Sequence, residues 1–68
     1  MTIYEEIEQE IKDAREKFPA FHSQHEAYAV ILEELDEYWA LVKQDKDGRH
    51  ELIQVAAMCV AAIRECES

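Results

Sequence analysis

Glycine, proline and basic residues are scarce in this sequence. One Gly and one Pro occur in 68 residues, so few positions interrupt helical structure, and long helices are favoured. Lys and Arg total 7 against 16 Asp and Glu, which gives a net charge of −9. Because nucleic acids and anionic membranes bind clusters of Lys and Arg, we expect neither nucleic acid nor a membrane as a partner. The acidic charge is compatible with cation binding, and equally with simple solubility.

We also expect no signal peptide, no membrane-spanning apolar run and no intrachain disulfide from this sequence. Cys59 and Cys66 are seven positions apart. On one helix they would be separated by about 10 Å of rise, which is too far for an intrachain bridge. Cys-x6-Cys also matches no usual zinc spacing. We therefore expect a reducing, cytoplasmic location, with both cysteines as small buried thiols.

Three segments are predicted to be helical, at about residues 2–17, 23–44 and 49–65, so the expected fold class is all-α. Apolar residues recur at helical spacing in the first segment: Ile3, Ile7, Ile11, Ala14 and Phe18. Thr2 and Ser23 are expected N-caps, each with Glu three residues later. Pro19 ends the first helix, and we expect Phe18 and Phe21 beside it to pack into the core. The polar turn of residues 44–48 separates the other two helices.

The small size of the chain predicts an oligomer. A domain of 68 residues buries only about 60% of the surface of its unfolded chain, so its core stabilises it weakly. The middle of the third segment, LIQVAAMCVAAI, is apolar on nearly all sides. Two short neighbouring helices cannot cover such a helix, so we expect a second subunit to cover the rest. The predicted assembly is a dimeric or tetrameric helical bundle.

The second segment carries glutamates on its apolar side. At 100° per residue, one apolar stripe comprises Tyr28, Ile31, Leu32, Leu35, Trp39 and Val42. A neighbouring apolar group comprises Ala27, Val30, Tyr38 and Leu41. Glu34 lies within this second group, and Glu33 and Glu37 lie at its border. Burial of a charge is costly unless it is paired or bound to a metal, so Glu34 is expected to have a partner.

The third segment carries a matching pair, Glu51 and Gln54, on one helix face among apolar residues. Two antiparallel helices joined by a short turn would bring the two sets of oxygens face to face. Such hard oxygen ligands suit Mg²⁺, with Mn²⁺ as the alternative ion. Glutamates at this spacing are also common on solvated helices, so their apolar surroundings are what favours a metal site.

HEAYAVILEELDEYW, followed after a turn by RHELIQVAAM, resembles the MazG-like nucleoside triphosphate pyrophosphohydrolases of the all-α NTP pyrophosphatase superfamily. The resemblance covers residues 22–64. The family pattern is EExxE on one helix and ExxD on the next. Glu33, Glu34 and Glu37 match the first motif, and Glu51 matches the start of the second. Gln54 stands where the pattern has Asp.

The resemblance implies a single MazG-like domain over residues 1–68 that forms a dimer or a dimer of dimers. It implies Mg²⁺-dependent hydrolysis of a (deoxy)nucleoside triphosphate to the monophosphate and pyrophosphate, in nucleotide-pool housecleaning. The implied metal ligands are Glu34, Glu37, Glu51 and Gln54. Glu33 would be a further ligand or the base that orients the attacking water. Because Gln carries no charge, the alternative is a degenerate, non-catalytic helical oligomer that acts as an interaction or regulatory protein.

Several other residues are candidates for substrate contacts. Lys43, Arg49 and Arg64 are candidates for contacts to the phosphates, and His25 for a contact at the mouth of the site. His25 can also be grouped with His22 and Glu26 as a metal cluster, but we favour partly exposed residues at a helix start. Tyr38 and Trp39 can stack on a base, although packing in the core or between subunits is the favoured interpretation.

Overall fold

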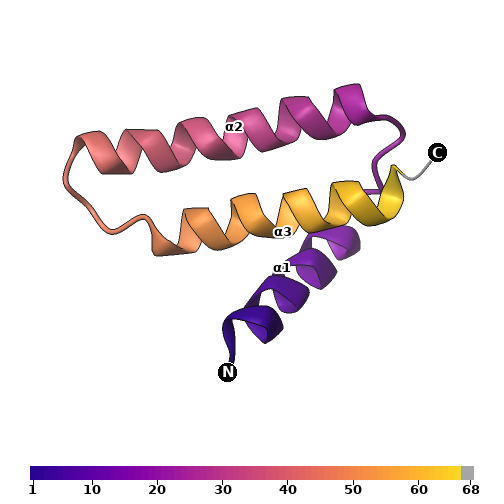
Figure 1. The fold of residues 1–68 in the computed structure, drawn as a ribbon, viewed down its shortest axis with the longest axis horizontal. Helices are drawn as coiled ribbons and strands as arrows, with labels where there is room; N and C mark the ends of the chain where they lie inside the picture. Colours follow the sequence, from indigo (N-terminus) through magenta and orange to yellow (C-terminus); the bar gives the residue numbers. More distant parts are fainter. Residues whose placement is uncertain (67–68) are drawn as a thin grey trace.

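Residues 1–66 are described by a computed structural model as three α-helices without a strand. The helices are α1 (Ile3–Lys17), α2 (Gln24–Lys43) and α3 (Arg49–Glu65) (Figure 1). Their bounds agree with the predicted ones to within one residue at each end, so the all-α prediction is confirmed. Within the described range, none of the helices combines the length and apolar character that crossing a bilayer requires.

Both predicted helix caps are present. Thr2 and Glu5 form a reciprocal capping box: the Glu5 N–H donates to Thr2 Oγ1 at 3.1 Å, and the Thr2 N–H donates to Glu5 Oε1 at 2.9 Å. Ser23 Oγ accepts from the Glu26 N–H at 3.2 Å. Glu26 does not return the bond to Ser23, because its carboxylate lies 3.4 Å from the backbone N of His22 instead. The starts of α1 and α2 therefore follow from the local sequence.

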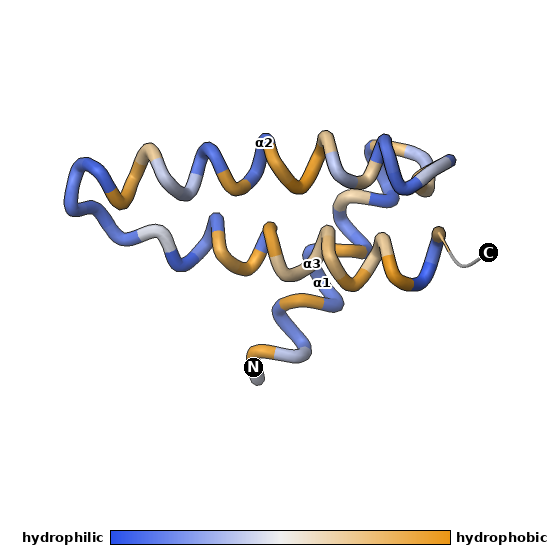
Figure 2. The backbone as a smooth tube through the Cα atoms, turned by 45° about the horizontal axis from the view of Figure 1, so that its top comes forward, coloured by the Kyte–Doolittle hydropathy of each residue, from blue (hydrophilic) through white to orange (hydrophobic). Residues whose placement is uncertain are grey.

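The central element of the fold is α3. It runs antiparallel to α2, as the hairpin prediction required, and α1 crosses its other side at an angle (Figure 1). Within residues 1–66, no Cα of α1 lies within 8 Å of a Cα of α2. Apolar residues occur along the length of α3, whereas the α2–α3 turn is hydrophilic (Figure 2). Both other helices therefore depend on α3 for their packing.

The turn after α2 places a non-glycine residue in the left-handed conformation. Asp45 has φ 56°, and its N–H donates to the Val42 carbonyl at 3.0 Å. The Lys46 N–H donates to the Leu41 carbonyl at 3.0 Å. These two bonds form a Schellman motif, in which glycine is the usual left-handed residue. Asp tolerates this conformation better than most residues do.

Gly48, the single glycine, serves a different purpose. Its φ is negative, −106°, so it caps α3 without needing left-handed geometry. It is buried, and a Cβ at this position would lie 2.7 Å from the Tyr38 ring. Gly48 therefore allows the ring of α2 to lie directly against the start of α3.

The core is small and rich in alanine. The buried apolar residues of the described chain are Ile11, Phe21, Ala27, Ala57, Met58 and Ala61. Ala57 and Ala61 are fully buried, and small side chains of this kind let helices approach closely. Phe21 is buried as expected. The expectation was wrong for Phe18, which is 65% exposed because the chain turns at Pro19 and only Phe21 faces the bundle.

Ion pairs join α1 to α3 along their whole contact. Those among the described residues are Arg15–Glu65, Arg49–Glu6 and Arg64–Glu8. The first is the least exposed: Arg15 donates to both Glu65 oxygens at 2.6 Å, and the Phe21 N–H donates to Glu65 Oε1 at 2.9 Å. The Arg15 hydrogen bonds lower the pKa of Glu65, so this carboxylate stays charged. These contacts fix the angle at which α1 crosses α3.

A broad apolar surface remains uncovered in the single chain. Most of the stripe predicted on α2 faces outward, including Trp39, which is 55% exposed, while the group containing Glu34 faces α3. Ile63 on α3 is 71% exposed. The accessible surface is 5079 Å², compared with about 4,500 Å² expected for a compact monomer of this mass. The chain by itself is thus more open than a typical small globular protein.

Candidate functional site

A cavity of about 580 Å³ lies between α1, α2 and the segment that connects them. Its volume is in the range of small-molecule sites. Among the described residues, its acidic lining comprises Glu10, Asp13, Glu26, Glu33 and Glu34. The helix α3 contributes Gln54 and Met58, and the basic residues Arg15 and Lys17 lie at the end of α1. The cavity thus combines several carboxylates with nearby positive charge.

Glu34 is the carboxylate of this cavity that has a buried oxygen without a hydrogen-bond partner among the described residues. It is half-buried on the side of α2 that faces α3. Its Oε2 atom is inaccessible to solvent and has no hydrogen-bond partner among the described residues. Burial raises the pKa of Glu34 above its ordinary value, and the nearby carboxylates of Glu37, Glu33 and Glu10 raise it further. Such a group is stabilised by a proton or by a cation.

The structure brings together part of the predicted ligand set. Glu33, Glu34 and Gln54 line the same cavity, with Glu33 exposed. Glu37 and Glu51 do not line it, although Glu37 is close enough to act on the pKa of Glu34. In the part of the chain that the structure describes, no group of three or more His, Cys, Asp or Glu is arranged to hold a metal ion.

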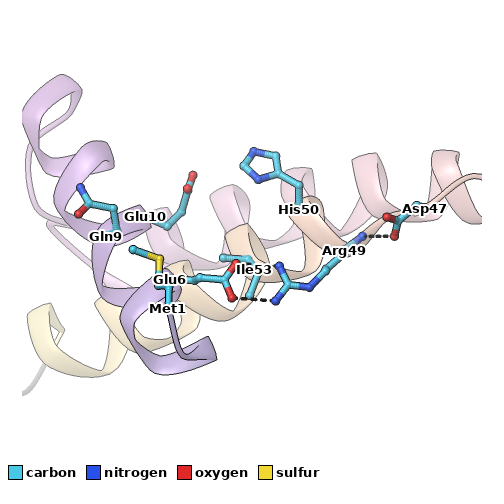
Figure 3. A pocket seen from close by; sticks show the side chains of 8 residues that line it. All are labelled: Met1, Glu6, Gln9, Glu10, Asp47, Arg49, His50 and Ile53. Carbon is cyan, nitrogen blue, oxygen red and sulfur yellow. Dashed lines mark hydrogen bonds and ion pairs between the residues drawn. The ribbon is translucent and has the colours of Figure 1, made fainter.

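The predicted substrate contacts lie outside this cavity. Arg49 donates two bonds of 2.7 Å to Glu6, at a smaller cavity of about 360 Å³ between α1 and the start of α3 (Figure 3). Arg64 is paired with Glu8 in the same way. The Lys43 amine lies 5.7 Å from the centroid of the Trp39 ring. His25 is exposed on the first turn of α2.

The residues that sequence reasoning missed all lie on α1. Glu10, Asp13 and Lys17 face the cavity beside Glu34. A signal was present for Glu10, because at 100° per residue it lies about 20° from Ile3, at the edge of the apolar stripe. No local signal indicated that this edge would face the glutamates of α2, since that depends on the angle at which α1 crosses α3.

The arrangement can attract a divalent cation through hard oxygen donors, and Lys17 can contact an anionic ligand at the same opening. Comparison with family models gives no match for this chain. Comparisons with curated proteins and with solved structures give no match either. The function of this chain is therefore inferred from the site itself and from the sequence pattern.

Proposed function

We propose that this protein is a Mg²⁺-dependent nucleoside triphosphate pyrophosphohydrolase of the MazG-like type, which converts a (deoxy)nucleoside triphosphate to the monophosphate and pyrophosphate. The observation that carries the proposal is the buried, unpartnered Oε2 of Glu34 within the EExxE motif. A protein without a cation at this position would keep a destabilising carboxylate for no benefit. The cavity volume of about 580 Å³ also suits a small ligand.

The donor chemistry around Glu34 fits a hard divalent cation. The orphaned Oε2 needs a positive partner, and Gln54 lines the same cavity. Glu37 and Glu51 are each three residues along a helix from a residue that lines it, Glu34 and Gln54. These four residues are the proposed ligands of Mg²⁺, or of Mn²⁺ in its place. When bound, the ion would supply Lewis-acid polarisation of the phosphate oxygens.

The other residues of the cavity have separate proposed roles. Glu33 is exposed at the opening, so its carboxylate is accessible to a water molecule and can accept its proton. Lys17 lines the same cavity and is the best-placed cation for a phosphate oxygen. The four substrate contacts predicted from sequence lie elsewhere in the single chain. They keep a role in this proposal only if a second subunit brings them to the cavity.

We propose that the active form is a dimer or a dimer of dimers. The outward apolar face of α2 and the exposed Ile63 of α3 form the surface that a second copy would cover. The radius of gyration is 12.2 Å, compared with about 11 Å for a compact domain of 68 residues. This open shape is expected of one part of a larger bundle.

A second candidate function is a non-catalytic helical oligomer that acts as an interaction or regulatory protein. It is supported by the uncharged Gln54 in the second motif and by Arg49 and Arg64, which are occupied by Glu6 and Glu8. Arginines held in this way are less available for substrate phosphates.

Pyrophosphate release distinguishes the two candidates. The assay uses a panel of nucleoside and deoxynucleoside triphosphates with Mg²⁺, with Mn²⁺ and with EDTA. We expect metal-dependent release by the wild type and at least about a tenfold loss in Glu34→Gln. Glu16→Gln, an exposed residue on α1 outside the cavity, is the matched control and should retain activity. No release under any condition would favour the non-catalytic oligomer.

A further inference from the structure

The outward apolar stripe of α2 has the spacing of a coiled-coil seam. Its members follow one another at intervals of four, three, four and three residues: Tyr28, Leu32, Leu35, Trp39 and Val42. This alternation gives the 3.5-residue period with which one helix packs along another. All five side chains are exposed in the single chain. The α2 seam, as we call these five residues, is thus a packing surface that no helix of residues 1–66 covers.

A second seam with the same spacing runs along α3. Its members are Leu52, Ala56, Cys59, Ile63 and Cys66. Leu52 and Ile63 are exposed, and the three small side chains between and after them are half-buried. None of the residues of the α2 seam or of this α3 seam is charged, although 34% of the chain is charged. The two seams therefore differ from the solvated helix faces of this protein.

The two seams lie side by side on one face of the α2–α3 hairpin. A groove of about 340 Å³ runs between them, and its lining includes Tyr28 of the α2 seam and Ile63 of the α3 seam. Among the described residues, this lining comes from α2 and α3 alone. Val30 and Glu33, which line the cavity beside α1, lie about 140–160° round α2 from its seam. The seams therefore occupy the face of the hairpin that α1 and the candidate cavity leave free.

The size of this face matches one side of a stable dimer. Large apolar side chains have areas of about 150–250 Å², so the exposed fractions of the large seam residues amount to roughly 550–900 Å². A stable interface buries about 800 Å² on each partner. The two seams also suit a two-fold axis, because such an axis places the same surface of each copy against the other, and these seams have equal periods.

We infer that a second copy of this chain covers this face, so that two α2–α3 hairpins stack seam on seam into a four-helix core, with both α1 helices and both candidate cavities on the outside. The inference rests on the proposed dimer and deepens it by specifying the face that the two copies share. It also has a consequence for the candidate site: each cavity is built from the residues of one chain. Arg49 and Arg64, held by α1 through Glu6 and Glu8, stay away from the cavity of the partner.

Sedimentation equilibrium measures the dissociation constant of the dimer, and one substitution in each seam tests the face. Leu35→Asp and Ile63→Asp should each raise this constant at least about thirtyfold, as for residues at the centre of an interface. Tyr4→Asp is the matched control, since Tyr4 is a large apolar residue that is exposed on α1, away from both seams. This control should change the constant by less than about threefold.

The fluorescence of Trp39, the single tryptophan of the chain, tests the same face without a substitution. Trp39 belongs to the α2 seam, so the second copy should shield its ring from water. Its emission should therefore shift to longer wavelength when the wild-type dimer is diluted until it dissociates. Circular dichroism checks that each protein is folded, and the wild-type dilution decides the test if a seam variant does not fold.

The remaining outcomes separate the inference from the proposed function. A dimer that resists both seam substitutions, or that dissociates without a change in Trp39 emission, overturns the shared face and leaves the proposed dimer standing. A folded wild type that is monomeric at every concentration overturns the shared face and the proposed dimer together. Pyrophosphate release, measured on the same samples, tests the proposed activity separately.

Discussion

Replacing Glu34 by Gln should stabilise the protein in the absence of metal, which is an unusual effect for a mutation in a packed interface. The substitution keeps the size of the side chain and removes the negative charge. The amide group of the introduced glutamine can donate hydrogen bonds to the neighbouring carboxylates, which repel Glu34 in the wild type. Among these carboxylates, that of Glu37 acts most strongly. The prediction therefore follows from the same orphaned oxygen that suggests a function.

The expected size of the effect follows from the burial of Glu34. A buried acceptor without a partner costs about 1–3 kcal/mol in the free energy of unfolding. Because the Glu34 side chain is still partly solvated, screening reduces this range, and we expect a gain of about 1 kcal/mol at pH 7 in EDTA. For a domain of this size, that gain raises the melting temperature by about 4–8 °C.

The pH dependence of this gain has a definite sign. The pKa of Glu34 is raised in the folded state, so the wild type binds the proton more tightly when folded than when unfolded. At pH values below the ordinary carboxylate pKa, Glu34 is protonated in both states, and wild type and Glu34→Gln should be equally stable. As the pH rises through the raised pKa, the wild type alone loses stability, and the difference between the two proteins should grow.

Thermal unfolding followed by circular dichroism, at several pH values with EDTA and with Mg²⁺, measures both effects. With Mg²⁺ the order should reverse, because a cation at 100 times its dissociation constant stabilises the wild type by about 2.7 kcal/mol. Glu33→Gln, an exposed neighbour, is the control and should change stability by less than about 0.5 kcal/mol. A lower melting temperature for Glu34→Gln in EDTA at pH 7, or a difference that does not vary with pH, would refute the reasoning.

Four further predictions concern the fold. Asp45→Gly should stabilise the protein by about 0.5–1 kcal/mol in urea denaturation, because glycine adopts the left-handed conformation without strain; equal or lower stability contradicts this. Gly48→Ala should destabilise it by about 1–3 kcal/mol, since the new Cβ would overlap the Tyr38 ring, and a shorter side chain at position 38 should recover part of the loss. Glu65→Gln should lower the free energy of unfolding by about 1–3 kcal/mol at pH 7. Because the pKa of Glu65 is lowered in the folded protein, this difference from wild type should vanish as the pH falls through that pKa. A difference that does not vary with pH would count against the ion pair. Trp39→Glu should convert the proposed oligomer to monomer in analytical ultracentrifugation, whereas a wild type that is already monomeric at micromolar concentration excludes the oligomer.

Local features of the fold were predictable from the sequence, because their causes lie within a few residues. The helix bounds and the caps at Thr2 and Ser23 follow from side chains three positions apart. The conformation of the α2–α3 turn was not predictable in the same way. Asp45 takes the left-handed position and Gly48 does not, because a glycine is needed where the ring of Tyr38 meets α3. That requirement comes from tertiary packing.

The candidate site was predictable only in part for a similar reason. Glu34 was identified because its neighbours on α2 are apolar, and the structure places it toward α3 with Gln54 on the same cavity. Which of two overlapping apolar faces of α2 would pack on α3 could not be read from periodicity, since both have helical spacing. The position of Glu10 on this cavity depends on the packing of α1 on α3, which includes ion pairs between residues 43 to 56 positions apart and leaves no local pattern.

No Cα of α1 lies within 8 Å of a Cα of α2 in the described chain, and this separation has a mechanical consequence for the cavity that the two helices border. Its two walls are joined by the connecting segment 18–23 and by their common packing on α3, so a small rotation of α1 changes the width of the opening and leaves the α2–α3 hairpin intact. The exposed pairs Arg49–Glu6 and Arg64–Glu8 are weakened by salt, because the Debye length falls to about 8 Å at physiological ionic strength. The less exposed Arg15–Glu65 pair beside the connecting segment is screened less and would act as the pivot. A higher ionic strength should therefore let α1 rotate more freely and let the cavity admit a wider ligand. Hinge motions of this kind occur on the microsecond-to-millisecond timescale.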